Sequence, residues 1–374
     1  MKERIPMASA DLDDADIEAV LGVLRTGRLA LGPKIVEFER AMADYVGTRH
    51  AVAVNSGTAA LHLIVKALGI GAGDEVLVPS FTFAASVNAF LYEGAAPVFV
   101  EIDRDTYNLD PADLERRITP RTRAIMAVDV FGHPADWDEL QRIAEQHGLK
   151  LIDDSCEALG ASYKGVRLGR FGNAAAFAFY PNKQITTGEG GIIVTDDDAM
   201  AGLCRSLSNQ GRGQMGAWLE HERLGYNYRI DEMSAALGAS QLRRLEEFLM
   251  KRAAVARRYS ERLARFDWVR PPVVKPDVRM SWFVYVVTLA DGLDRDSVMQ
   301  QMEARGVPVR GYFSPVHLQP YIRERFGCES GALPVTESIA RRTIALPFHN
   351  NLSEAHIEEV VAALAEVVER AQEK

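Results

Sequence analysis

One lysine of this chain, Lys183, stands in a sequence context that suits covalent chemistry. The aromatic, apolar run 177–180 precedes it, and the segment 186–191, rich in Thr and Gly, follows. A lysine on a surface turn is the commoner case. Here, however, the strand and the glycine cluster would shield the amine from water. Burial favours the neutral form of an amine, which is the form that attacks a carbonyl. The pattern therefore predicts a lysine that forms a Schiff base.

If that carbonyl belongs to pyridoxal phosphate, the ring nitrogen of the cofactor needs an anion beside it. Asp154 directly follows an expected strand at 149–153, and ligands bind at the carboxyl ends of parallel strands. An Asp after a strand is also a common turn or cap residue, but its combination with Lys183 favours the cofactor role. Glu157, three residues on, is a candidate contact for the phenolic oxygen, with a solvated Glu as the alternative.

The cofactor also needs a site for its phosphate and a side chain that stacks on its ring. Ser56, Gly57 and Thr58 join a strand to an amphipathic helix, and exposed amides at a helix N-terminus bind anions. A simple helix cap is an equal alternative for this segment. Phe83 follows the expected strand at 75–79 and is the candidate for stacking, although a buried core Phe is the commoner arrangement.

Short apolar runs alternate with amphipathic segments through the first two thirds of the chain. We expect strands at 51–54, 75–79, 97–102, 124–130, 149–153, 174–180 and 191–195, and helices at 58–68, 86–93, 110–117 and 137–147. This alternation indicates an α/β fold with a mostly parallel sheet.

A different pattern follows, with one long helix at 233–266, a strand at 282–289 and helices at 296–303 and 354–372. We expect a large domain over 1–245, whose N-terminal segment can pack on a smaller α/β domain over 246–374.

The composition is that of a globular protein, with 374 residues, 47% hydrophobic and 25% charged, and a net charge of −9. The negative charge argues against a nucleic-acid or anionic-membrane partner. The three cysteines are far apart, so neither a disulfide framework nor a metal cluster is expected. No run resembles a signal peptide or a membrane span, which predicts a cytoplasmic protein.

Taken in order, these segments resemble the sugar aminotransferases of the DegT/DnrJ/EryC1/StrS family. The resemblance rests on residues 179–183 with 188–191, and on 55–61, 153–154, 225–229, 32–39 and 345–348. It implies a fold type I transferase dependent on pyridoxal 5'-phosphate. Such a protein has a mostly parallel mixed sheet flanked by helices, a smaller C-terminal α/β domain, and active sites between the subunits of a homodimer. The implied reaction moves an amino group from glutamate to a nucleotide-linked keto-sugar, without a metal.

The resemblance also assigns roles to individual residues. Lys183 would carry the cofactor as a Schiff base and then move protons between substrate and cofactor. Asp154 would hold the ring nitrogen, and Gly57 and Thr58 the phosphate. Asn227 would reach the phosphate from the partner subunit, although a turn residue before the helix that follows is its plainer interpretation.

Three positions depart from the family pattern. Many relatives have Ser, a phosphate ligand, where this chain has Ala178, and many have His where it has Asp129 or Gln210. These departures put one phosphate contact and nearby substrate contacts in doubt. None of them concerns Lys183, and family members that act as dehydratases have His in its place, so the lysine favours transamination.

The substrate contacts are the least determined part of the site. The loop 312–320 resembles the segment that approaches the sugar in relatives, which makes His317 a candidate contact, with a structural His as the alternative. Arg28 and Arg212 are candidates for phosphate or carboxylate groups. We favour amination at C4 of a 4-keto-6-deoxyhexose. A C3 keto-sugar and a cyclic ketone such as an inosose are alternatives.

Two other functions use the same cofactor. A lyase, dehydratase or desulfurase has the same fold, but a desulfurase needs an activated cysteine, and the surroundings of Cys328 show no sign of activation. A regulatory protein that binds pyridoxal phosphate without catalysis is the second alternative, and it predicts no reaction with glutamate.

Overall fold

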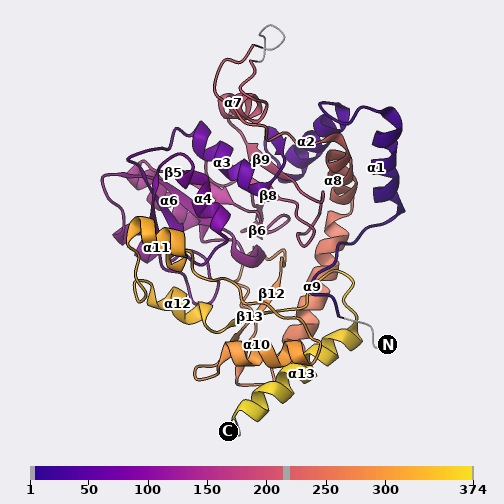
Figure 1. Cartoon of the computed structure of the whole chain (residues 1–374), viewed down its shortest axis with the longest axis vertical. Helices are drawn as coiled ribbons and strands as arrows, with labels where there is room; N and C mark the ends of the chain where they lie inside the picture. The colour runs from indigo at the N-terminus through magenta and orange to yellow at the C-terminus, as the bar shows by residue number, and fades with distance from the viewer. Residues whose placement is uncertain (1–4, 214–219, 373–374) are drawn as a thin grey trace.

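A seven-stranded sheet forms the centre of the larger part of the molecule (Figure 1). The computed structural model describes residues 5–213 and 220–372. Across the sheet the strands are β1 (His50–Val54), β9 (Gly191–Thr195), β8 (Ala174–Ala178), β5 (Lys150–Asp154), β4 (Thr122–Val128), β2 (Glu75–Pro79) and β3 (Ala96–Val100). Only β9 runs antiparallel to its neighbours in this sheet. The predicted mostly parallel mixed sheet is thus confirmed.

Helices cover both faces of this sheet, and the alternation of side chains along each strand shows how. In β2, Val76 and Val78 pack with α3 (Gly57–Ala67) and α4 (Ala84–Leu91) on one face. Leu77 between them packs on the other face with α6 (Trp137–His147). Strands that are buried on both faces become continuous apolar runs in the sequence, which is why their positions were predictable. The helices α5 (Pro111–Arg116) and α7 (Asp198–Ser208) complete the two layers.

A second core is built around the antiparallel sheet β10 (Val269–Arg270), β12 (Tyr285–Leu289) and β13 (Thr343–Leu346). The helices α10 (Arg295–Ala304) and α13 (Glu354–Gln372) pack against it. Between them in the chain come η2 (Val316–Leu318), α11 (Pro320–Phe326) and α12 (Pro334–Ala340). A third, small sheet joins β6 (Ser162–Tyr163), β7 (Val166–Arg167) and β11 (Val278–Arg279).

The helix expected at 233–266 is in fact two helices, α8 (Glu232–Arg243) and α9 (Leu245–Leu263). The break lies at Arg244, whose φ of −102° and ψ of 3° leave the helical region. The side chain of Arg244 is engaged by Asp11, Asp13 and Asp16. The prediction of one helix was wrong because apolar spacing continues through the break, while the contacts at the break come from the start of the chain.

Helix α9 connects the two cores. Phe248 belongs to a core beside the large sheet, whereas Val255 and Tyr259 belong to the core of the smaller one. The N-terminal segment crosses between them as well, since Ile5 lies in the smaller core and the Met7 carbonyl accepts the Phe348 amide at 3.0 Å. We therefore propose that the large domain covers residues 1–245 and that the smaller domain covers residues 246–374.

Two helices near the N-terminus, α1 (Asp14–Thr26) and α2 (Pro33–Val46), pack on α8 (Figure 1). Asp13 and Asp16 form a capping box at the start of α1. Among the described helices, none is both long and apolar enough to cross a bilayer.

Candidate active site

A cavity of about 530 Å³ opens at the carboxyl ends of the parallel strands. Its volume falls in the range of about 300–1,000 Å³ that is usual for small-molecule and cofactor sites. The cavity lining includes seven of the candidate site residues, which are Ser56, Gly57, Thr58, Phe83, Asp154, Glu157 and Lys183. They come from segments that follow β1, β2, β5 and β8. The shared strand direction is what gathers them, because parallel strands end at one edge of the sheet.

Lys183 points into this cavity from the loop that follows β8. Its side chain is only 12% exposed, and its Nζ lies 3.7 Å from Oε1 of Glu157 and 3.8 Å from the centre of the Phe283 ring. Burial raises the pKa of Glu157, although the Lys183 ammonium opposes that rise. Glu157 Oε2 also accepts the Phe131 amide at 2.9 Å. The amine is thus held in a place with little water, beside one carboxyl group and one aromatic face.

Asp154 supplies a buried carboxylate at the end of β5. Oδ2 accepts the Ser86 hydroxyl at 2.6 Å and Oδ1 accepts the Cys156 amide at 3.2 Å. Asp154 is 4% exposed. In the described ranges, no Lys, Arg or His lies within ion-pair distance of its carboxylate. A buried carboxylate without a cation is costly. The arrangement therefore fits a ligand that brings its own positive charge, such as a protonated pyridine nitrogen.

The N-terminus of α3 forms another wall of the cavity. Ser56 is its N-cap, and its hydroxyl accepts the Ala59 amide at 3.1 Å, as the simple capping alternative requires. The first amides of a helix have no partner within the helix, so Gly57 and Thr58 bring N–H groups to this wall. The backbone approach is close, because a Cβ on Gly57 would lie 2.7 Å from the Ala178 Cβ and 2.9 Å from the Cys156 Sγ. Such a wall fits a phosphate group.

We expect that Ala178→Ser will tighten binding of pyridoxal phosphate. The Ala178 Cβ lies against the start of α3, so a hydroxyl there adds a donor where the helix amides already favour an anion. One added hydrogen bond corresponds to about three- to tenfold in Kd, measured by titrating the cofactor-free protein. Ala178→Val adds volume without a donor and should weaken binding. A serine variant that binds no more tightly than the wild type would place the phosphate elsewhere.

The other predicted residues lie at the rim of the cavity or outside it. Phe83 lines the cavity but is 64% exposed, so it stands at the rim. Asn227 pairs with Asn209 through the backbone and accepts from Asn55 Nδ2 at 3.4 Å, and it does not line the cavity of its own chain. Arg28 is exposed and donates to the Leu31 carbonyl.

The backbone of Arg212 forms a bridge with His221, and its carbonyl accepts the Ser206 hydroxyl at 2.6 Å. It lies outside the cavity lining as well. Neither Arg28 nor Arg212 is therefore among the residues that the cavity brings together.

His317 is buried and lies outside the lining of the described cavity. Its Nδ1 lies 2.6 Å from the Ser80 hydroxyl, and its Nε2 lies 3.3 Å from Glu337. Burial lowers the pKa of His317, and the residue is 1% exposed. The network ties the loop to β2 and α12. Tyr312, Phe313 and Ser314 of the same loop, and Gly311 just before it, do line the cavity.

The departures at Asp129 and Gln210 also lie outside the cavity lining. Asp129 is fully buried and accepts the Ala135 amide at 2.8 Å and the Ser155 hydroxyl at 2.7 Å. It shares a hydrogen bond with Asp153, and burial raises the pKa of Asp129 to about 6 and that of Asp153 well above its usual range. The amide of Gln210 donates to the Tyr226 carbonyl at 2.8 Å.

The buried carboxyl pair predicts a pH effect on stability. Because the pKa of Asp129 is raised in the folded state, folding retains a proton that the unfolded chain loses near pH 4. The contribution of Asp129 to stability therefore falls as the pH rises from about 4 to about 6, and that of Asp153, whose pKa is raised further, falls at higher pH. Asp129→Asn keeps the acceptor for Ala135 and lets an amide donate to Ser155, so no proton is needed.

We expect this variant to lose most of that decline and to be about 1–3 kcal/mol more stable than the wild type at pH 7. Urea unfolding between pH 4 and 8 measures the effect. Asp44→Asn is the control for net charge, since Asp44 is exposed on α2. Parallel curves for the wild type and Asp129→Asn would contradict the shared-proton arrangement.

Other cavity residues were not among the candidates from the sequence. Phe283 comes from a segment beside the smaller sheet, so no local pattern connected it with Lys183. Cys156 lies two residues after Asp154, and strand alternation alone would have pointed to it. Asn182 Oδ1 is buried in the cavity lining with no hydrogen-bond partner among the described residues.

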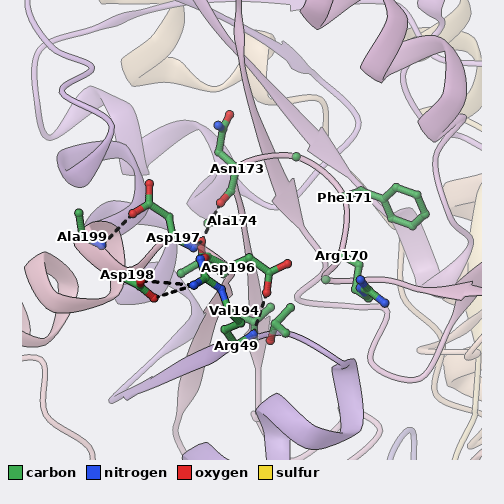
Figure 2. A pocket seen from close by; sticks show the side chains of 14 residues that line it. Arg49, Arg170, Phe171, Asn173, Ala174, Val194, Asp196, Asp197, Asp198 and Ala199 are labelled. Carbon is green, nitrogen blue, oxygen red and sulfur yellow. Dashed lines mark hydrogen bonds and ion pairs between the residues drawn. The ribbon is translucent and has the colours of Figure 1, made fainter.

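A second pocket of about 610 Å³ lies at the opposite end of β8 and β9 (Figure 2). Arg49 is fixed there by Asp198 at 3.2 Å and donates its backbone amide to Asp196 at 2.7 Å. The pocket is open, and the sheet edge that carries Lys183 faces away from it. In the described ranges, no cluster of His, Cys, Asp or Glu is arranged to hold a metal.

Comparison with known proteins agrees with this geometry. The model of the DegT/DnrJ/EryC1/StrS aminotransferase family matches residues 10–365. The GDP-perosamine synthase of Caulobacter vibrioides is 42% identical over 98% of each chain. A Streptomyces venezuelae enzyme, dTDP-3-amino-3,4,6-trideoxy-alpha-D-glucose transaminase, is 41% identical over 94% of this chain and 92% of its own.

Solved structures show the same fold. DesV from S. venezuelae, in complex with a ketimine intermediate, has a TM-score of 0.91 and 39% identity, with 98% of both chains covered. Spr1654 of Streptococcus pneumoniae, in its PMP form, has a TM-score of 0.93 and 28% identity, covering 98% of this chain and 99% of its own.

The lysine, the buried carboxylate and the helix N-terminus fit the amine-reactive aldehyde, the pyridine nitrogen and the phosphate of pyridoxal phosphate. The family model covers nearly the whole chain, and both curated relatives exceed 40% identity. This fold type I protein is an aminotransferase dependent on pyridoxal phosphate, and it belongs to the DegT/DnrJ/EryC1/StrS aminotransferase family.

Proposed function

We propose that this enzyme moves an amino group from glutamate to a nucleotide-linked keto-sugar, at C4 of a 4-keto-6-deoxyhexose. The observation that carries the proposal is the buried Lys183 amine in one cavity with Asp154, which pairs with no cation among residues 5–213 and 220–372. The names of the two curated relatives support a nucleotide-linked sugar as the acceptor. Residues 311–314 line the cavity, which supports the proposed approach of the sugar along this loop.

The residues around the cavity have distinct proposed tasks. Pyridoxal phosphate, when bound, supplies an electron sink for the carbon next to the transferred nitrogen. Asp154 would hold the charge of the ring nitrogen, and the amides of Gly57 and Thr58 would hold the phosphate. Lys183 would take a proton from the reacting carbon and return it, since its amine is close and shielded. Phe83 would cover the ring from the rim.

Incubation with glutamate and a panel of nucleotide-linked keto-sugars tests this proposal. We expect one 4-keto-6-deoxyhexose to gain an amine, detected by mass, with the amine placed at C4 by NMR. Release of 2-oxoglutarate identifies glutamate as the donor. If the protein is saturated with cofactor and converts glutamate but aminates none of the sugars, the sugar assignment is wrong.

Amination at C3 is the second candidate, because one relative of 41% identity is named as a 3-amino sugar transaminase. The same panel decides between the two carbons when it includes matched 3-keto and 4-keto sugars on one nucleotide. An inosose belongs in the panel as a cyclic ketone without a nucleotide.

We further propose a homodimer in which Asn227 completes the partner's site. Asn227 lies beside Asn55 and close to the start of α3, outside its own cavity, and Tyr180 at the cavity is 52% exposed in the single chain.

Two inactive variants should then restore activity when they are co-expressed. A mixed dimer of Lys183→Ala and Asn227→Ala has one site with both defects and one intact site, which gives about a quarter of the wild-type turnover after random pairing. Each variant alone should stay strongly impaired. Light scattering measures the assembly. Absence of recovery in a confirmed mixed dimer would place Asn227 in its own chain's site.

A further inference from the structure

Arg252, on α9, is a buried cation whose hydrogen-bond partners, among the described residues, all belong to the loop of Lys183 and to the segment before β12. Its guanidinium also lies 5.6 Å from the centre of the Phe348 ring. The residue is 2% exposed. One terminal nitrogen of its guanidinium donates to the carbonyls of Trp282 and Phe283 at 3.0 and 3.1 Å. The other donates to the carbonyl of Lys183 at 2.9 Å and to that of Asn182 at 3.4 Å. A single side chain therefore joins two segments that are about a hundred residues apart in the sequence.

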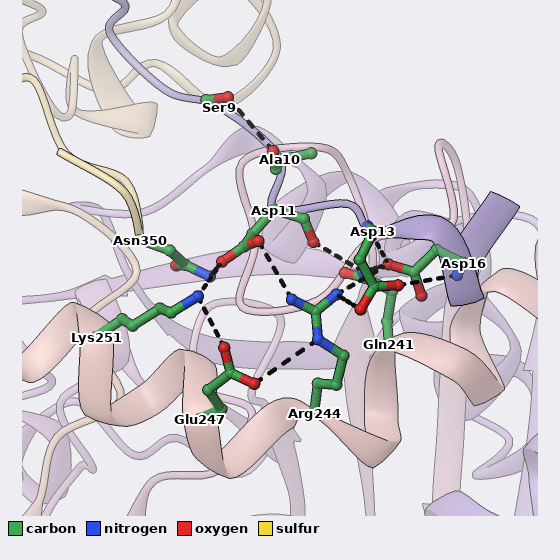
Figure 3. Close-up of polar contacts among 10 residues, drawn as sticks. All are labelled: Ser9, Ala10, Asp11, Asp13, Asp16, Gln241, Arg244, Glu247, Lys251 and Asn350. Atoms are coloured by element: carbon green, nitrogen blue, oxygen red, sulfur yellow. Dashed lines mark hydrogen bonds and ion pairs between the residues drawn. The ribbon is translucent and has the colours of Figure 1, made fainter.

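The neighbouring cations Arg244 and Lys251 are paired with carboxylates instead of backbone carbonyls. Figure 3 shows Arg244 and Lys251 surrounded by carboxylates, with Lys251 at 3.0 Å from Asp11 and 2.8 Å from Glu247. Among residues 5–213 and 220–372, no carboxylate lies within ion-pair distance of Arg252. Burial lowers the pKa of Arg252 to about 10. Burying a cation without a counter-ion is unfavourable, so a role in packing alone would be served better by an apolar side chain.

The two segments that Arg252 joins carry the amine and the ring beneath it. Lys183 Nζ lies 3.8 Å from the centre of the Phe283 ring, and Arg252 binds the backbone carbonyls of these same two residues. The planar guanidinium presents its N–H groups in a fixed fork. That fork sets the distance between the two carbonyls, and through them the position of the amine relative to Phe283.

We propose that Arg252 is a positioning residue that fixes the Lys183 loop against Phe283, and so holds the amine where it reacts with pyridoxal phosphate. This inference rests on the proposed role of Lys183. A lysine at position 252 would keep the charge but has one nitrogen, which cannot reproduce the fork across both segments. Arg252→Lys therefore tests the geometry of the guanidinium while keeping its charge, whereas Arg252→Met removes both.

The test uses the full-length protein, stripped of cofactor and mixed with pyridoxal phosphate. Borohydride trapping followed by peptide mass analysis gives the rate at which Lys183 becomes linked to the cofactor. The pH midpoint of the absorbance change of the bound cofactor is the second readout. The variants are Arg252→Met and Arg252→Lys. Lys251→Met is the matched control, because it removes the adjacent cation of the same helix, which faces the N-terminal segment. Thermal unfolding verifies that each protein is folded.

We expect both Arg252 variants to link the cofactor about tenfold more slowly, or slower still, since they lose hydrogen bonds from a charged donor. Their pH midpoint should shift, and Lys251→Met should match the wild type in both readouts. If Arg252→Met does not fold, Arg252→Lys alone decides. A wild-type rate and midpoint in folded Arg252→Lys would overturn the geometric role.

A trapped link on some lysine other than Lys183 in the wild-type protein would instead defeat the proposed role of Lys183. The two failures therefore give different results. Slow linking at Lys183 in the Arg252 variants supports both proposals.

Discussion

Replacing Lys183 with alanine will abolish transamination and remove the cofactor link that borohydride traps. The Lys183 amine is the only lysine nitrogen that lines the described cavity, and its side chain is 12% exposed. Loss of both the nucleophile and the group that moves the proton predicts a fall in kcat on the order of 10⁴-fold or more. Steady-state release of 2-oxoglutarate, together with intact-protein mass after reduction, measures the two effects.

The cavity itself should survive this substitution, because its walls come from strand ends and from α3. Lys183→Ala should therefore still bind pyridoxal phosphate, but reversibly, so that dialysis removes it. Lys164→Ala is the control, since Lys164 pairs with Asp138 on the surface. If Lys183→Ala keeps a reducible link or keeps turning over, an amine other than that of Lys183 forms the Schiff base.

Asp154→Asn is expected to have the second largest effect on catalysis. The carboxylate is buried, is held by Ser86 and Cys156, and has no cation in the described structure. An amide of the same shape cannot keep the ring nitrogen protonated, so the electron sink is lost. Removing one preorganised electrostatic partner corresponds to about 10²–10³-fold in kcat, with a smaller change in the KM for glutamate.

Asp153→Asn is the matched control for this experiment. Asp153 precedes Asp154 on the same strand, but it accepts the Gly169 amide at 3.0 Å and the Ser155 hydroxyl at 2.7 Å on the other side of the sheet. Its activity should stay close to that of the wild type. Equal losses in the two variants would mean that the strand end, and not the carboxylate at 154, is what matters.

Local sequence patterns predicted the large sheet well, for a physical reason. Strands such as β2 and β9 are buried along their whole length. They therefore form continuous apolar runs in the sequence, which a local pattern is enough to detect. The direction of parallel strands then places Ser56, Asp154 and Lys183 at one edge. These are the parts of the cavity for which the sequence carries its own evidence.

The remaining parts depend on contacts between distant segments. In the sequence, His317 looks like a residue that could contact the substrate. In the structure its ring is buried and lies within hydrogen-bond distance of Ser80, which directly follows β2. Arg244 ends α8 because aspartates near the N-terminus engage it. Phe283 reaches Lys183 only because the smaller sheet packs there. The start of α1 does not depend on distant segments. The capping box of Asp13 and Asp16 is a local sequence pattern from which this helix start could have been predicted.

The reaction of the purified, cofactor-loaded enzyme with glutamate alone tests whether Lys183 and its cofactor carry out transamination, and it requires no choice of sugar. We expect one equivalent of 2-oxoglutarate per chain in a single turnover, a change in the absorption spectrum of the cofactor, and loss of the reducible link at Lys183. An unchanged spectrum with no 2-oxoglutarate, from protein whose cofactor is shown to be bound, would contradict this expectation.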